Sequence, residues 1–182
     1  IGLRFTYYAY RNRALTEIQT QAPIWSHLVY IGVLATIYGI AGIIQITSSF
    51  DLPYRSGVML GTTLLLAFAV RQIHFTATSA GRDGIRARPS ERVVRAGFIA
   101  LVFFDVLVVF LYGHSEWTAA LEGGSAIAFV AYGFAFYHDQ SGSSRLQGTM
   151  LDSLLRHLLP VLTFASLVNI VSLAVPFGLQ RV

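Results

Sequence analysis

The stretch Gly57–Thr78, GVMLGTTLLLAFAVRQIHFTAT, decides the fold of this chain. As an α-helix it rises about 33 Å, close to the ~30 Å hydrocarbon core of a bilayer. At about 100° per residue, one narrow face of that helix carries Thr63, Ala67, Arg71, His74 and Thr78. An ionisable pair is costly against lipid. We therefore expect this face to look into a protein interior or a wet cavity.

Composition places the whole chain in the membrane class. Apolar residues make up 54% of the chain and charged residues 12%, whereas soluble domains carry about 25% charged residues. All thirteen basic residues are arginine. The absence of lysine excludes covalently bound retinal or pyridoxal phosphate, because both need a lysine Schiff base. The absence of cysteine excludes disulfides and thiolate metal ligands.

Around that stretch the pattern predicts an all-α integral membrane protein with five transmembrane helices in a bundle. The expected spans are 24–47, 57–78, 93–113, 120–138 and 157–178. Pro160 is expected in the first turn of the last span, where proline is tolerated. Residues 1–22 are too polar to span and are expected to form an interfacial amphipathic segment, which leaves 23–182 as one transmembrane domain.

The arginines predict the orientation of the bundle. An N-terminus inside the cell puts ten arginines on one side and only Arg55 and Arg181 on the other, with Arg71 within the membrane. This positive-inside bias predicts a cytoplasmic N-terminus and an outer C-terminus in a prokaryotic plasma membrane. Because topology accounts for the basic charge, no nucleic-acid partner is expected.

The polar loop 79–92 holds a further cluster of basic residues. Its arginines include Arg82, Arg86 and Arg88, which are candidates for binding anionic lipid headgroups. The alternative is that they determine topology alone.

A second group of polar residues lies deeper in the predicted spans. Taken from the middle of each span, Arg71 and Asp105 differ in depth by about five residues of rise, which an arginine side chain can bridge. Asn169 and Tyr132 fall near the midplane of their helices. These four residues suggest a polar site for transport or permeation of a proton, ion or small solute. The alternative is a structural Arg71–Asp105 ion pair between two helices.

Two histidines form the third candidate site. His27 and His74 lie near the same predicted boundary and point inward on neighbouring helices. Paired histidines are common axial ligands of haem and also bind other metals, so they are candidate cofactor ligands. The alternative is that both histidines simply lie at headgroup depth, where their rings find partners.

Three functions follow from these patterns. The first is a small transport or permeation protein, expected to form a homo-oligomer because glycine stripes offer helix contact surfaces. The second is a non-catalytic sensor module or an accessory subunit that packs with other membrane subunits. The third is a redox subunit that binds haem or a metal. No catalytic motif appears, so an enzyme is not expected.

Overall fold

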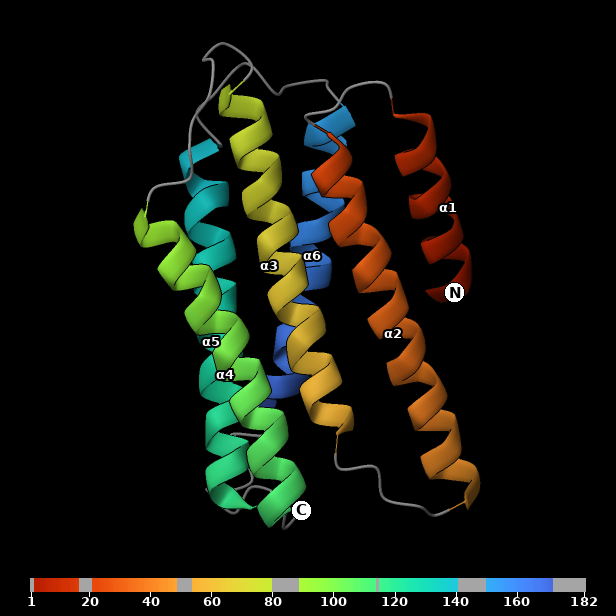
Figure 1. Ribbon diagram of the computed structural model, residues 1–182, viewed down its shortest axis with the longest axis vertical. Helices are drawn as coiled ribbons and strands as arrows, with labels where there is room; N and C mark the ends of the chain where they lie inside the picture. The colour runs from red at the N-terminus through yellow and green to blue at the C-terminus, as the bar shows by residue number, and fades with distance from the viewer. Residues whose placement is uncertain are drawn as a thin grey trace.

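The computed structural model describes residues 2–16, 21–48, 54–79, 89–113, 115–140 and 150–171. Within these residues the chain forms six helices (Figure 1): α1 (Gly2–Leu15), α2 (Ala22–Ser48), α3 (Arg55–Ser79), α4 (Pro89–Tyr112), α5 (Glu116–Gln140) and α6 (Met150–Val171). Five of them, α2 to α6, are long and apolar enough to cross a membrane. The predicted all-α bundle with five spanning helices is confirmed.

The last span differs from its prediction. The apolar part of α6 runs from Asp152 to Val171, five residues earlier than expected at its start. Pro160 therefore lies inside the helix and not in its first turn. The helix begins early because Leu155 and Leu158 already pack into the core. Residues 172–178 of the predicted span, including Pro176, lie outside the described residues.

Helix α3 is the centre of the bundle. It packs against α2, α4, α5 and α6 (Figure 1). In its apolar stretch 61% of the residues are buried, a larger share than in any other of the five spans. Thr63 and Ala67 are fully buried and His74 is 8% exposed. The predicted inward face of α3 is thus confirmed at these three positions.

A glycine brings three helices together at the middle of α3. A Cβ atom on Gly133 of α5 would lie 2.6 Å from Leu162 Cδ2 of α6 and 3.6 Å from Ala67 Cα of α3. Even an alanine at this point would require the Leu162 side chain to shift. Small residues at such crossings allow the close backbone approach that stabilises helix packing in lipid.

Helix α1 lies lengthwise beside the first half of α2 and antiparallel to it (Figure 1). Gly2 lies against Thr36, and Thr6 lies against Gly32. Ala9 is the one buried residue of α1, and its tyrosines are exposed. The sequence predicted an interfacial segment, and the structure adds that this segment is a helix docked along α2. Its position in a bilayer stays a prediction.

The two ends of the bundle differ in charge. One end, called here the arginine-rich end, carries Arg13, Arg92, Arg95 and Arg156. At the opposite end the described residues include one arginine, Arg55, whose Nη1 donates a 2.7 Å hydrogen bond to Gln45 Oε1. The Arg55 guanidinium also lies 4.5 Å from the centre of the Tyr38 ring. These contacts join the ends of α2 and α3.

Candidate functional site

Asp105 of α4 is a fully buried carboxylate that faces α3. Its neighbour Val106 packs directly on Gly57, and a Cβ atom on Gly57 would lie 3.8 Å from Asp105 Oδ2. The missing side chain at Gly57 therefore brings the carboxylate up against the backbone of α3. Asp105 lies seven residues before the end of α4, which is about 10 Å inside the span.

A second carboxylate belongs to the same region. Glu122 of α5 is 4% exposed and is the charged group that interacts electrostatically with Asp105. It lies six residues after the start of α5, about 9 Å from that end of the bundle, so the two carboxylates share one depth. Within the described part of the chain, both Asp105 oxygens and Glu122 Oε1 are buried without a hydrogen-bond partner. We call Asp105 and Glu122 the acid pair.

Hydroxyl and amide groups lie in the same half of the bundle as the acid pair. Thr118 and Ser125 flank Glu122 on the buried face of α5. About one to two helical turns further into α3, Thr63 Oγ1 accepts a 3.3 Å hydrogen bond from Asn169 Nδ2 of α6, and both residues are buried. Four helices therefore contribute polar groups to one half of the bundle.

The predicted Arg71–Asp105 contact is wrong. Gly57 lies beside Val106 and Gly61 beside Val102. These two contacts define the position of α4 along the axis of α3, called here the slide of α4. Arg71 lies fourteen residues beyond Gly57, about 21 Å along the axis of α3, which is too far for an ion pair. The prediction failed because it took depth from the middle of each span. In the structure α4 is shifted along α3 toward the arginine-poor end (Figure 1).

Arg71 lies instead in an aromatic cluster near the arginine-rich end. Its guanidinium is 4.5 Å from the centre of the Phe75 ring and 6.0 Å from that of Phe136. His74 packs on the same two rings at 5.5 and 5.3 Å. Arg71 and His74 thus share the face predicted for them. Near the arginine-rich end, however, their partners are aromatic rings: Phe75 of the same helix and Phe136 of α5.

Tyr132 is also separated from the acid pair. Its ring lies 5.0 Å from Phe136, 5.2 Å from Phe98 and 6.2 Å from Phe68. Of the four residues predicted for the polar site, the structure therefore brings Asp105 and Asn169 to one half of the bundle. It places Arg71 and Tyr132 among the rings.

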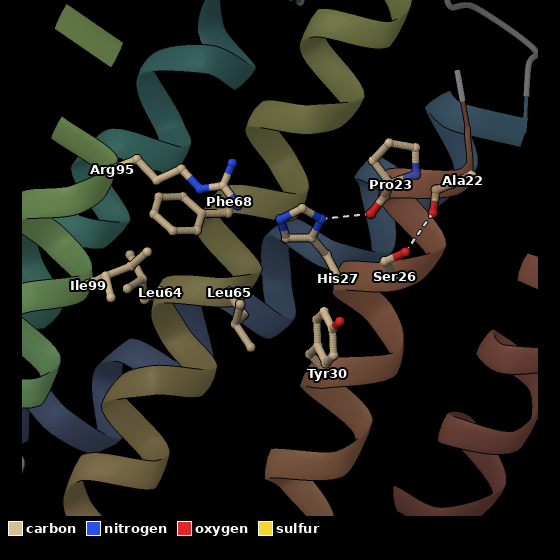
Figure 2. A pocket seen from close by; sticks show the side chains of 10 residues that line it. All are labelled: Ala22, Pro23, Ser26, His27, Tyr30, Leu64, Leu65, Phe68, Arg95 and Ile99. Carbon is tan, nitrogen blue, oxygen red and sulfur yellow. Dashed lines mark hydrogen bonds between the residues drawn. The ribbon is translucent and has the colours of Figure 1, made fainter. Parts of the chain in front are cut away.

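The structure does not bring the two candidate haem ligands together in the one cavity described here, among the residues that it places. His27 lines a cavity between α2, α3 and α4, and His74 is not part of its lining (Figure 2). No group of three or more His, Cys, Asp or Glu side chains that could hold a metal ion occurs in the part of the chain that the structure describes. Haem or metal binding by this pair stays a prediction. The candidate headgroup ligands Arg82, Arg86 and Arg88 lie outside the described residues.

Sequence reasoning missed Glu122. The available signal was the spacing of Thr118, Glu122 and Ser125, which steps by four and then three residues and so stays on one helix face. An acidic residue inside an apolar span, flanked by hydroxyls on its own face, marks that face as inward.

Comparisons with protein-family models, with curated proteins and with solved structures find no match for this chain.

Proposed function

We propose that this chain carries a proton or a small cation across the membrane, with the acid pair as its intramembrane binding group. The supporting observation is the burial of Asp105 and Glu122 together, at one depth, with both Asp105 oxygens and Glu122 Oε1 lacking a hydrogen-bond partner among the described residues. Two ionised carboxylates in such a place repel each other and are poorly solvated. A shared proton or a bound cation relieves both costs.

The neighbouring groups suit such a cargo. Carboxylate and hydroxyl oxygens are the ligands that hard cations prefer, and they also pass protons along hydrogen bonds. Thr118 and Ser125 place hydroxyls on the same face as Glu122, and the Thr63–Asn169 hydrogen bond continues the polar groups toward the middle of α3. The proposed orientation has the arginine-rich end in the cytoplasm, by the positive-inside rule, so the acid pair lies in the outer half of the bundle.

Flux in proteoliposomes tests this proposal. Asp105→Asn keeps the shape of the side chain but removes the charge, so flux is expected to fall at least about tenfold. Glu122→Gln is expected to reduce flux in the same direction. The matched control is Glu116→Gln, an exposed acid six residues earlier on α5, which should leave flux unchanged. Entrapped dyes sensitive to pH and to sodium would identify the cargo.

Thermal unfolding of the same variants separates lost function from lost structure. Because a neutral amide is cheaper to bury than a second carboxylate, Asp105→Asn should be at least as stable as the parent protein. Parent protein without any flux, or full flux in Asp105→Asn, would contradict the proposal. So would an equal loss in Glu116→Gln.

A further inference from the structure

A lateral cavity of about 510 Å³ lies on the opposite side of α3 from α5 and α6 (Figure 2). Its walls come from α2 and α4, and its floor comes from α3. Across the described parts of α2 and α4, the backbones of the two helices stay apart, with no Cα atom of one within 8 Å of a Cα atom of the other. The cavity is therefore a groove that opens sideways between them, in the direction in which a spanning bundle meets lipid.

The charged and imidazole groups of the groove, Arg95 and His27, lie at its arginine-rich end. The Arg95 guanidinium lies 5.6 Å from the centre of the Phe68 ring. His27 Nδ1 lies 2.7 Å from the Pro23 carbonyl oxygen, which can only accept, so Nδ1 carries the proton in this bond. The other ring nitrogen of His27 faces the side on which Arg95 and Phe68 lie (Figure 2).

Apart from the Tyr30 hydroxyl, the rest of the groove is apolar and lies deeper in the bundle. Ile99 comes one turn after Arg95 on α4, and Leu64 comes one turn before Phe68 on α3. Because α3 and α4 run in opposite directions, both steps lead about 6 Å away from the arginine-rich end. Figure 2 shows Ile99, Leu64 and Leu65 below the level of Arg95 and His27. The groove is therefore amphipathic along its length.

The charges along the groove indicate which class of ligand it can bind. Arginine is the only charged residue type among those that line the groove, and no carboxylate is among them. Arg95 and Arg71 both interact electrostatically with His27, so this end of the groove is positive. A guanidinium beside an imidazole suits a phosphate, and the absence of a carboxylate leaves no partner for a choline or ethanolamine cation.

We propose that this groove binds an anionic phospholipid, with its phosphate at Arg95 and His27 and one acyl chain along Leu64, Leu65 and Ile99. The lipid comes from the leaflet at the arginine-rich end and is held as a bound lipid between α2 and α4. This site is independent of the acid pair, which lies toward the other end of α3.

The test measures the thermal unfolding midpoint of the full chain in detergent, because a ligand that binds the folded state raises it. The probes are phosphatidylglycerol and phosphatidylcholine with identical acyl chains, and inorganic phosphate. Phosphatidylglycerol is expected to raise the midpoint more than phosphatidylcholine, and phosphate alone is expected to leave it unchanged. Equal shifts with the two lipids, or a shift with phosphate alone that matches phosphatidylglycerol, would overturn the proposal.

Two variants locate the effect in the groove. Arg95→Gln should weaken the apparent affinity for phosphatidylglycerol about fivefold, as expected for one arginine near a membrane surface. Arg92→Gln is the matched control, since this exposed arginine lies one turn earlier on α4 and outside the groove lining. Ile99→Trp fills the apolar part of the groove and should weaken binding of both lipids. An equal loss in Arg92→Gln, or unchanged binding in both groove variants, would place the lipid elsewhere.

Discussion

Helices α3 and α4 lie side by side and run in opposite directions, yet their surroundings differ. In the apolar stretch of α3, 61% of the residues are buried within the protein. In that of α4 only 11% are, although α4 has the highest mean hydropathy of the five spans. Lipid tails are as apolar as leucine, so no hydrophobic force drives α4 into the interior. Helix α3 occupies the centre because it carries small and polar residues that lipid solvates poorly. Of these two helices, the one with the more apolar sequence therefore has fewer residues buried against protein.

The largest expected effect compares a phenylalanine on each helix. Phe68 on α3 is 4% exposed and Phe103 on α4 is 72% exposed. Phe68→Ala should lower the free energy of unfolding by about 3–5 kcal/mol, because it leaves a cavity that the packed helices cannot close. Phe103→Ala should cost less than about 0.5 kcal/mol, because lipid chains fill the space. Unfolding titrations in mixed micelles measure both, and equal losses would refute the contrast between the helices.

A medium effect is expected from one substitution made on both helices. A Cβ atom on Gly57 of α3 would clash with Val106, whereas a Cβ atom on Gly97 of α4 meets nothing within 4 Å. Gly57→Leu should therefore destabilise the protein by about 1–3 kcal/mol through overpacking. Gly97→Leu should be neutral or slightly stabilising, since leucine favours a helix more than glycine does. A tolerated Gly57→Leu would mean that α4 does not approach α3 at this point.

The smallest expected effect concerns the slide between the two helices. Arg71 and Asp105 are about 21 Å apart along the axis. The changes in the free energy of unfolding in Arg71→Gln and Asp105→Asn should therefore add to within about 0.5 kcal/mol in a double-mutant cycle, whatever their signs. Asp105→Asn with Glu122→Gln is the positive control, because these groups interact and should show coupling of about 1 kcal/mol. Strong coupling of Arg71 to Asp105 would restore the ion pair expected from the sequence.

The candidate site was only partly predictable. Asp105 and Asn169 could be found because a polar residue inside an apolar span must face protein or water. The same argument also applies to Glu122, but it could not show that Glu122 is the neighbour of Asp105 or that Thr63 is the neighbour of Asn169. The depth of a residue within its own helix says nothing about how far that helix slides along the next one. The groove at Arg95 was missed for a related reason, since three separate helices build it.

The sequence by itself determined those properties that depend on a single segment and its free energy in a bilayer. Hydropathy alone identified five spans, and the polar face of α3 alone indicated that this helix lies inside. These properties follow from the free energy of each segment in lipid, which its own residues set.

Only the tertiary structure decided which polar residues meet. The contact of Val106 with Gly57 sets the slide of α4, brings Asp105 to the depth of Glu122 and leaves Arg71 among phenylalanine rings. The physical reason is that slide and rotation come from side-chain packing between helices that are far apart in sequence. Such packing has no counterpart in the composition or period of any single helix.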